Sequence, residues 1–315
     1  MKILIWQTAY LGDVVLTTPL IRTIKNNLPT AHIAFVGRSF IQELLKGYEI
    51  ELITFNKSLR ESLQILRRIE DFQVVISPHI SARSALILFM SKIPKRIGFD
   101  RSELSWLYTH TVKHSWEKHE VDRNLELLRP LGIKKYERMP YLYLYQEEKE
   151  RVKRDFALPE EFIVLSPFSN FPLKEWHLGG WIELSKRISM PVVIVGTKRD
   201  VEKSKVFNGT KAINLVGRTS LRELMAVISL SKLVVSCDSS PVHIANALGV
   251  PALSLYTSTS PQYGFYPLKG FYLVPDLSCS PCSPNPKRCK TGTQACLTFI
   301  RVEDVLEKLT DLLSA

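Results

Sequence analysis

Polar and charged residues stand at four places along the chain where an apolar, strand-like segment gives way to a helix-like one. The first is Gly12-Asp13, which follows the apolar residues 3–6. Glycine lets the backbone turn tightly and bring its N–H groups close to an anion, and the dipole of the following helix favours the charged form of the Asp13 carboxyl. The simpler alternative is an ordinary N-cap, which contributes about 1 kcal/mol to helix stability.

Two further junctions carry residues that suit phosphate and hydroxyl ligands. In "SPFSNFPLKEW" the side chains of Ser169 and Asn170 precede Lys174, and a lysine beside a helix N-terminus is suited to bind a phosphate. In "VGTKRD" Asp200 follows Gly196 at about the position where acidic residues of nucleotide sites accept hydrogen bonds from ribose hydroxyls. The alternatives are a surface lysine and a helix cap.

The fourth junction is the richest in hydrogen-bond donors. "CDSSPVH" places Asp238, Ser239 and Ser240 directly before Pro241, a residue suited to the first turn of a helix. The hydroxyls and N–H groups at such a helix start can hold a diphosphate or sugar hydroxyls. His243 follows on the side that could face the same ligand, and its alternative is a buried structural histidine.

Strand-like and helix-like segments alternate from the first residue, which is the βαβ pattern of a parallel sheet. The expected strands are residues 2–6, 33–36, 52–55, 73–77, 162–166, 191–195, 213–215, 233–236 and 252–256. The expected helices are residues 13–27, 38–46, 59–69, 178–188, 199–207, 221–229, 242–248 and 303–313. Because the pattern restarts after a less regular middle, we expect two doubly wound α/β domains, residues 1–150 and 151–315.

In doubly wound sheets, ligands bind beyond the carboxyl ends of the strands. The topology therefore predicts that all four junctions line one cleft between the domains. The last helix is also expected to be able to pack back on the first domain. Neither G-x-G-x-x-G nor G-x-x-x-x-G-K-[ST] occurs in the chain. This absence argues against a Rossmann dehydrogenase and against a P-loop protein.

The chain has 315 residues and a formal net charge of +11, which favours anionic partners. Residues 57–101 hold nine Lys/Arg against four Asp/Glu. No stripe of stacking aromatic residues accompanies these charges, so nucleic acid is not expected as a partner. No apolar stretch reaches the ~20 residues that a membrane helix needs, and no signal-peptide core is present, which predicts a cytoplasmic protein.

Four of the five cysteines form a late cluster with the spacing C-x2-C-x6-C-x6-C, and Cys237 stands apart. The cluster consists of Cys279, Cys282, Cys289 and Cys296. Four thiolates could bind zinc, two disulfides could form in a thermophile, and free thiols are the usual state in a cytosolic chain. The x6 spacings fit no common zinc motif, so we expect no metal.

Three segments together resemble the family-9 glycosyltransferases, the ADP-heptose:lipopolysaccharide heptosyltransferases. They are "MKILIWQTAYLGDVVLTTPLIRTIKNNLP", "LKEWHLGGWIEL" and "VSCDSSPVHIANALGVPALSLYTSTSP". The late cysteines resemble the heptosyltransferase II branch of that family. Two positions depart from the family pattern. Ser240 replaces a glycine, and "YTSTSP" replaces Tyr-Gly-Pro-[ST]-x-P, so both changes add bulk near the phosphates.

The resemblance implies two Rossmann-like domains of the GT-B type facing a cleft, and an inverting transfer of heptose from the co-substrate ADP-heptose without a metal or other cofactor. It implies that Asp13 is the general base, because the attacking hydroxyl must lose its proton. It implies that Lys174 binds the donor diphosphate. The other implied donor-binding residues are Ser169, Asn170, Asp200, Thr219 beside adenine, Asp238, Ser239, Ser240 and His243.

The same resemblance implies an anionic acceptor, the inner core of lipopolysaccharide that carries Kdo or heptose. Gly12, Lys57, Arg60 and Arg83 are candidates for binding this acceptor, and a solvated basic surface is the alternative for the three basic residues. The net charge suits peripheral contact with the cytoplasmic face of the inner membrane, and we expect a monomer. The alternative functions are another nucleotide-sugar-dependent GT-B enzyme and a non-catalytic nucleotide-sugar-binding protein.

Overall fold

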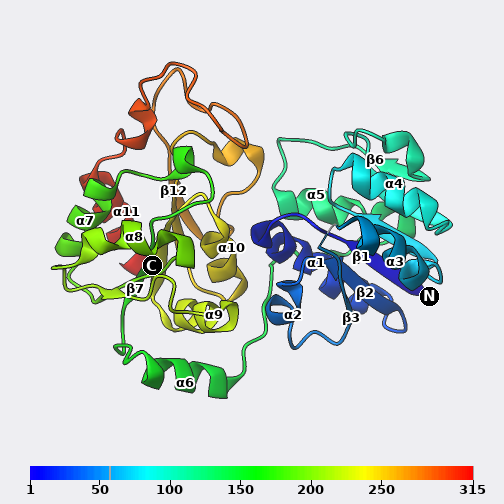
Figure 1. Ribbon diagram of the computed structural model, residues 1–315, viewed down its shortest axis with the longest axis horizontal. Coiled ribbons are helices and arrows are strands. Elements are labelled where there is room, and N and C mark those ends of the chain that lie inside the picture. The colour runs from blue at the N-terminus through cyan, green and yellow to red at the C-terminus, as the bar shows by residue number, and fades with distance from the viewer. Residues whose placement is uncertain (57, 315) are drawn as a thin grey trace. The chain divides into compact units, whose positions relative to one another are not determined.

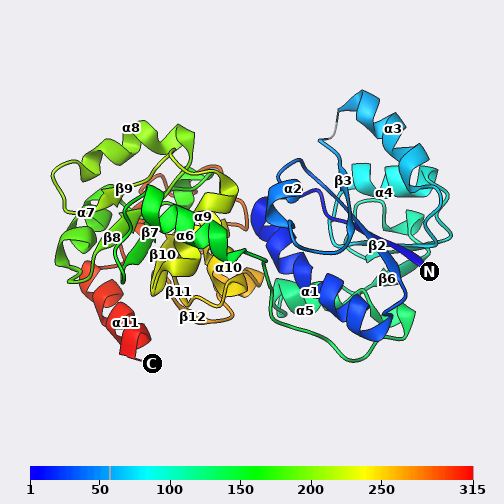
Figure 2. The ribbon, with the colours of Figure 1, turned by 90° about the horizontal axis from the view of Figure 1, so that it is seen from below.

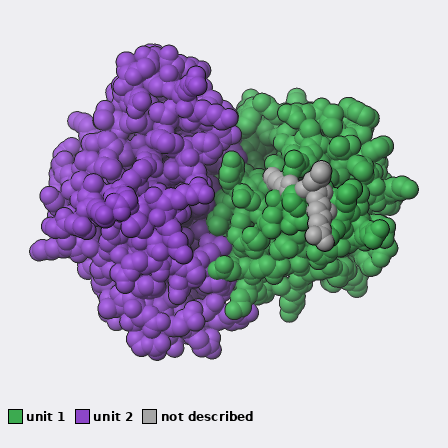
Figure 3. All heavy atoms as spheres, in the orientation of Figure 1, with its two compact units in different colours: residues 1–143 green, residues 144–315 purple. Residues whose placement is uncertain are grey.

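The computed structural model describes residues 1–56 and 58–314, apart from the side chains of residues 59 and 60. The chain divides into two compact units, Met1–Tyr143 and Leu144–Ala315, which Figure 3 colours separately. The predicted division at 150/151 falls inside helix α6 (Gln146–Asp155), whereas the observed one precedes it. The reason is that α6 packs on α9 (Leu221–Leu230) and so belongs to unit 2.

Within the described residues, unit 1 contains one parallel sheet with the strand order β3-β2-β1-β4-β5-β6. The strands are β1 (Lys2–Trp6), β2 (His32–Gly37), β3 (Glu51–Thr54), β4 (Val74–Ser77), β5 (Lys95–Phe99) and β6 (His110–Val112). The helices are α1 (Leu11–Asn27), α2 (Ile41–Leu44), α3 (Leu59–Ile69), α4 (Ala82–Met90) and α5 (Glu120–Glu126), with the 3-10 turns η1 (Ser105–Leu107) and η2 (Arg129–Leu131). Because the chain winds outward from the centre in both directions, the carboxyl ends of β1 and β4 form a switch point.

Helices cover both faces of this sheet. In Figure 2, α3 and α4 lie on one side of the strands and α1 and α5 lie on the other. Ile65 and Ile69 of α3 and Leu88 of α4 are buried in one apolar core with strand residues such as Val75. The burial of these side chains is the main contribution that holds the layers together.

Helix α1 continues through Pro19, although proline has no N–H to donate to the carbonyl of Val15. The hydroxyl of Thr18 donates to that carbonyl instead, at 2.7 Å. Residues 14–21 are all buried. The helix is therefore anchored firmly and carries Asp13 in its first turn.

Within the described residues, unit 2 repeats the architecture with the parallel strand order β12-β11-β10-β7-β8-β9. Its strands are β7 (Ile163–Ser166), β8 (Val192–Ile194), β9 (Ile213–Asn214), β10 (Leu233–Cys237), β11 (Ala252–Leu255) and β12 (Gly270–Leu273). Besides α6 and α9 its helices are α7 (Leu178–Arg187), α8 (Val201–Ser204), α10 (Ser240–Ala247) and α11 (Val302–Ser314), with 3-10 turns η3 (Pro172–Lys174), η4 (Lys198–Asp200), η5 (Lys205–Phe207), η6 (Pro261–Tyr263) and η7 (Ala295–Leu297). The switch point lies between β7 and β10.

The last helix, which we expected to be able to pack back on the first domain, packs on its own unit. α11 contacts α7 and β12 and buries Val305 and Leu309 in the unit 2 core (Figure 1). Trp176 and Trp181 are buried in the same core. Among the described residues, no helix combines the length and the apolar composition that crossing a bilayer requires.

Candidate active site

The two loops that leave β7 and β10 start side by side at the switch point of unit 2. The strands are neighbours and pair in parallel, with Ser166 opposite Ser236 near their carboxyl ends. The switch point is where doubly wound sheets bind ligands. The two loops carry six of the predicted donor-binding residues: Ser169, Asn170, Lys174, Asp238, Ser239 and Ser240.

Lys174 and Asp238 form an ion pair across these two loops. The Nζ atom of Lys174 lies 2.8 Å from Oδ2 of Asp238, and the side chains are 13% and 10% exposed. The ammonium also lies 5.5 Å from the centre of the Phe171 ring, a cation–π distance. An ammonium has three N–H donors, so the pairing with one carboxylate leaves Lys174 able to bind an anionic ligand as well.

The segment after β11, in which the sequence departs from the family pattern, supports this ion pair. Thr259 donates its hydroxyl hydrogen to Oδ2 of Asp238 at 2.9 Å. Thr257 donates to the carbonyl of Leu173 at 2.6 Å, and Ser258 donates to the same carbonyl. The segment "YTSTSP" was expected to add bulk near the phosphates, but its hydrogen bonds to Asp238 and Leu173 were not predicted, because these residues lie far apart along the chain. They meet because β11 pairs with β10.

Helix α10 begins at the fourth junction, as predicted, with Ser239 at the N-cap position and Pro241 in the first turn. The Ser239 hydroxyl lies 3.0 Å from the Ser236 hydroxyl. His243 is buried, and its ring centre lies 6.4 Å from that of Phe265. The structure thus places His243 inside unit 2, which fits the structural alternative; the donor-binding role stays a prediction.

Ser169 shapes the loop after β7. Its hydroxyl accepts a hydrogen bond from the N–H of Phe171 at 3.2 Å, and its own N–H donates to Glu175 at 3.0 Å. Glu175 in turn pairs with Lys203 at 2.9 Å. Asn170 is exposed in the same loop. These contacts fix the backbone that leads to Lys174.

Asp200 and Thr219 lie at the same edge of the sheet, after β8 and β9 respectively. The carboxylate of Asp200 accepts hydrogen bonds from the backbone N–H and the hydroxyl of Thr197, at 2.8 and 2.7 Å. Asp200 therefore has the local capping role that was its alternative interpretation. Thr219 is half-buried and directly precedes Ser220, the N-cap of α9.

Asp13 lies at the switch point of unit 1, in the first turn of α1. Its Oδ2 atom accepts a hydrogen bond from the N–H of Tyr10 at 3.1 Å. Its carbonyl accepts from the hydroxyl of Thr17 at 2.7 Å, and Thr17 accepts from the amide of Gln7 at 3.2 Å. The side chain is half-buried. Gly12 lies inside the first helical turn, so its predicted role in a tight turn before the helix is wrong.

The loop after β4 meets the loop that leads to Asp13. The hydroxyl of Thr8 lies 2.9 Å from Nδ1 of His79. The Ser84 hydroxyl lies 3.4 Å from the same nitrogen and accepts a hydrogen bond from the indole of Trp6 at 3.0 Å. His79 and Thr8 were not predicted as site residues. Both directly follow predicted strands, 73–77 and 2–6, which the structure pairs at the centre of the sheet.

Three basic residues were predicted to bind the acceptor, and the structure describes the side-chain position of one of them. Arg83 is exposed in the first turn of α4. Lys57 and the side chain of Arg60 lie outside the described residues. Their predicted roles stay predictions.

In the described part of the chain, all five cysteines are free thiols. Cys237 ends β10 and donates to the carbonyl of Pro167 at 3.0 Å, and burial raises its thiol pKa to about 12. Cys237 is therefore a neutral structural residue rather than a nucleophile. Cys296 is also buried, and burial together with its neighbours Cys282, Cys279 and Cys289 raises its pKa to about 11.

The cysteine-containing segment is fastened to the loop after β11, and the residues that follow it are fastened to those after Lys174. The N–H of Cys282 donates to the carbonyl of Ser258 at 2.8 Å. The N–H of His177 donates to the carbonyl of Leu297 at 3.0 Å, and the indole of Trp176 donates to the carbonyl of Ile300 at 3.0 Å. The segment therefore helps to hold the loop that presents Lys174.

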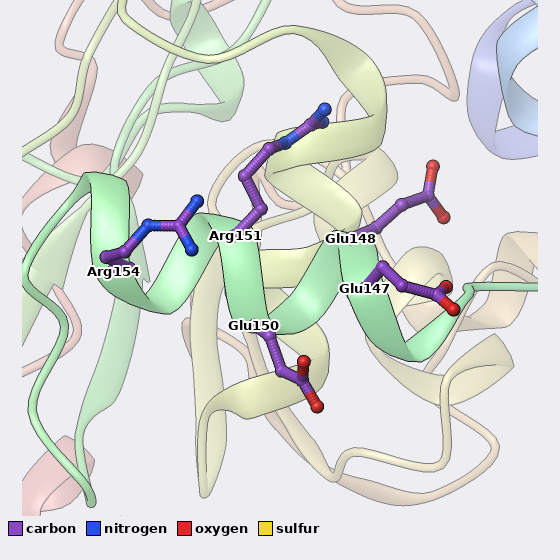
Figure 4. A pocket seen from close by; sticks show the side chains of 5 residues that line it. All are labelled: Glu147, Glu148, Glu150, Arg151 and Arg154. Atoms are coloured by element: carbon purple, nitrogen blue, oxygen red, sulfur yellow. The ribbon is translucent and has the colours of Figure 1, made fainter.

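A shallow hollow of about 350 Å³ lies along α6. Figure 4 shows that its lining side chains all come from this one helix. One of them, Glu148, is already paired with Arg222 of α9, with the Nε nitrogen of the arginine at 3.0 Å. The hollow is therefore an exposed helix surface, and we do not assign a site to it.

Known proteins are similar to this chain across both units. The family model described as glycosyltransferase family 9 (heptosyltransferase) matches residues 59–291. Lipopolysaccharide heptosyltransferase 3 of Escherichia coli (strain K12) is 27% identical over 285 residues, which cover 79% of this chain and 80% of that protein. Lipopolysaccharide heptosyltransferase 2 of Salmonella typhimurium (strain LT2) is 27% identical over 300 residues, which cover 84% of each.

Among solved structures, E. coli ADP-heptose lps heptosyltransferase II is similar to the chain with a TM-score of 0.81 at 24% sequence identity, over 100% of this chain and 99% of that one. At this identity the likeness concerns the fold, and it confirms the predicted α/β fold with two doubly wound parallel sheets of the GT-B type. The family model spans well over half of the chain. The chain therefore belongs to glycosyltransferase family 9, the heptosyltransferase family.

Proposed function

We propose that this glycosyltransferase moves heptose from ADP-heptose to the inner core of lipopolysaccharide, with inversion at the anomeric carbon and without a metal ion. The observation that carries the proposal is the Lys174–Asp238 pair at the switch point of unit 2. It joins a cation suited to a diphosphate to a carboxylate suited to sugar hydroxyls. The family's relatives are named for heptose transfer to lipopolysaccharide.

Departure of ADP leaves negative charge on the diphosphate, and unit 2 offers groups to stabilise it. Lys174 keeps N–H donors beyond the one directed at Asp238. The start of α10 adds the hydroxyl of Ser240 and the positive end of the helix dipole. A well-placed donor to developing charge contributes about 3 kcal/mol to the transition state.

Unit 1 supplies the base in this proposal. In an inverting transfer, the acceptor hydroxyl attacks the anomeric carbon from the face opposite the leaving ADP, and its proton passes to Asp13. The N–H of Tyr10 donates to one oxygen of the Asp13 carboxylate and holds it at the start of α1. A weak base is sufficient if the proton moves late, after the sugar has gained oxocarbenium character. Gly12, Arg83, Lys57 and Arg60 are proposed to bind the anionic acceptor.

We further propose that the protein works as a monomer in the cytoplasm, at the inner face of the inner membrane where its acceptor is exposed. The net charge of +11 supports contact with an anionic surface. Asp200 and Thr219, at the same sheet edge as Lys174, are proposed to bind the ribose and the adenine of the donor.

A transfer assay with separate donors tests the proposal. The purified chain is incubated with a heptose-deficient lipopolysaccharide core and ADP-heptose, ADP-glucose or a UDP-sugar, with and without EDTA. We expect transfer from ADP-heptose alone, unaffected by EDTA, and a product of inverted anomeric configuration by NMR. Binding of ADP-heptose without transfer to any core acceptor would favour a non-catalytic binder, and transfer from another donor would favour a different GT-B enzyme.

A further inference from the structure

Large apolar side chains are exposed on the outer surface of α3, α4 and η1, the elements that cover one face of the unit 1 sheet. They are Leu63, Leu86, Phe89, Met90 and Trp106. Trp106 is 76% exposed and Leu63 is 65% exposed. Single exposed apolar residues are ordinary on protein surfaces, but a group of them on neighbouring elements marks an interaction site.

The order of burial along α4 shows that its whole outer side is apolar beyond the first turn. Ala85 and Leu88 face the core, whereas Leu86 and Met90, one turn apart, are exposed. α4 contacts both α3 and η1, and Figures 1 and 2 show α3 and α4 side by side. The exposed groups of the three elements therefore belong to one surface.

Arg96 contacts both Phe89 of α4 and the backbone of η1. Its guanidinium lies 5.6 Å from the centre of the Phe89 ring. Its Nε donates to the carbonyl of Leu107 at 3.0 Å, and a second nitrogen donates to the carbonyl of Ile93 at 2.7 Å. Since Leu107 directly follows Trp106 and is buried, the first of these bonds fastens the backbone of η1, which carries the exposed Trp106.

Basic side chains lie on α3 and α4 or on the segments directly after them. The set consists of Arg67, Arg68, Arg83, Lys92 and Arg96. Neither α4 (ARSALILFM) nor η1 (SWL) contains an acidic residue. Glu61 of α3 accepts hydrogen bonds from backbone N–H groups at the helix start, Glu70 and Asp71 are exposed at the end of α3, and Glu103 is exposed near η1. Five basic side chains against these four acidic ones leave a small positive balance, which is concentrated on α4 and its ends.

We propose that this apolar-basic face, made of the five apolar and five basic side chains just named, docks on an anionic lipid bilayer. Tryptophan and phenylalanine favour the headgroup level of a bilayer, leucine and methionine favour the acyl chains below it, and arginine and lysine are attracted to anionic lipids. A nucleic acid would match the charges but would leave Leu63, Leu86 and Met90 without partners. The inference adds a specific surface to the membrane contact in the proposed function, and it does not require the transfer reaction.

Vesicle sedimentation with the full chain tests the docking face. We expect binding to vesicles with 30% phosphatidylglycerol in phosphatidylcholine and little binding to phosphatidylcholine alone. The variant Phe89→Ser/Trp106→Ser should bind anionic vesicles at least tenfold more weakly. For Arg67→Gln/Arg68→Gln the loss should be about fivefold per arginine at low salt, from about 1 kcal/mol for each basic residue.

Matched variants in unit 2 serve as controls. Val206→Ser/Leu313→Ser removes two exposed apolar side chains, and Arg151→Gln/Arg154→Gln removes two exposed arginines, from α6. Both should bind as the wild type does. Equal vesicle binding by the wild type and Phe89→Ser/Trp106→Ser would overturn the proposal. So would an absence of vesicle binding together with self-association that this variant abolishes, because a second copy would then cover the face.

A soluble core oligosaccharide separates this inference from the proposed function. With this acceptor, the Phe89→Ser/Trp106→Ser variant should transfer sugar as fast as the wild type. Vesicle binding by a wild type that transfers no heptose would refute the proposed function and support the docking face. Heptose transfer by a wild type that binds no vesicles would support the proposed function and refute the docking face.

Discussion

The ammonium of Lys174 and the hydroxyl of Thr259 both donate to one oxygen, Oδ2 of Asp238, at 2.8 and 2.9 Å. The three residues come from the loops after β7, β10 and β11. The carboxylate is therefore fixed from two directions, and removing either partner changes the environment of the other two residues.

Removal of the lysine leaves a largely buried carboxylate without its counter-charge. For Lys174→Met we expect the free energy of unfolding of unit 2 to fall by about 2 kcal/mol, since breaking a buried pair costs more than the pair contributes. Adding Asp238→Asn should restore part of the loss. Urea denaturation followed by tryptophan fluorescence measures both. In the control Lys203→Met, which breaks the more exposed pair with Glu175, the loss should stay below about 1 kcal/mol; equal losses would contradict the prediction.

Asp13→Asn should fold normally and lose transfer. The asparagine oxygen can still accept the hydrogen bond from Tyr10, so the helix start is kept, but the amide cannot accept the proton of the acceptor. We expect kcat to fall by about 10²–10⁴ with little change in donor affinity. The matched control is Asp304→Asn, which alters a carboxylate in the first turn of α11 that accepts from the N–H of Arg301. Near-normal turnover by Asp13→Asn would exclude Asp13 as the base.

Thr259 is a positioning residue in this scheme, because it acts on the donor through Asp238. Thr259→Val should raise the KM for the donor about fivefold and change kcat less, since one neutral hydrogen bond contributes about 1 kcal/mol. Thr259→Ser should restore the wild-type KM, because the hydroxyl is kept. The control Thr210→Val removes a hydroxyl that donates to the carbonyl of Phe207 and should leave the KM unchanged. A KM unaffected by Thr259→Val would show that Asp238 does not need this support.

Cys289 should be the most reactive thiol of the chain. The hydroxyl of Thr291 and the N–H of Gln294 stabilise its thiolate and lower its pKa to about 7. About half of the side chain is then ionised at pH 7 and about a tenth at pH 6, and the thiolate is the nucleophile. Iodoacetamide labelling followed by mass spectrometry should modify Cys289 first, with a rate that levels off above pH 8, and should spare Cys237.

The variant Thr291→Val checks the cause of this reactivity. Without the hydroxyl, the pKa of Cys289 should rise toward its ordinary value, and labelling at pH 7 should slow by several-fold. A labelling rate for the wild type that keeps rising through pH 9 would show that the thiol is not perturbed.

Helices and strands whose apolar residues stand out clearly from the polar residues around them were predictable from the sequence. The strand at 2–6 and the helix at 59–69 have the predicted bounds. The strand is a short, continuous apolar run that is buried from Ile3 to Trp6, and the helix has its buried residues Ile65 and Ile69 one turn apart among polar ones. α4 was missed because "ARSALILFM" is apolar on its exposed side as well as its buried side. The helix predicted at 38–46 contracts to α2, Ile41–Leu44. The strands β6 and β12 are short and exposed, so their sequences lack the apolar pattern of a buried strand.

The site was predictable as a list of residues but not as a set of contacts. Lys174 and Asp238 both follow predicted strands. Their pairing, however, depends on β7 lying next to β10, and the order of strands in the sheet is not visible in the sequence. The hydrogen bonds of Thr259 and His79 were not predictable for the same reason. Each approaches its partner only because parallel strands bring distant loops to one edge of a sheet.

The chain boundary at 143/144 separates two units that each have their own sheet and their own buried core. A crossover at this point therefore cuts through neither sheet. Recombination between family members at this junction should therefore produce folded chimaeras. Under the proposed function, the choice of acceptor should follow the source of unit 1, and the choice of donor should follow the source of unit 2. The family could diversify its products by exchanging halves as well as by point substitution.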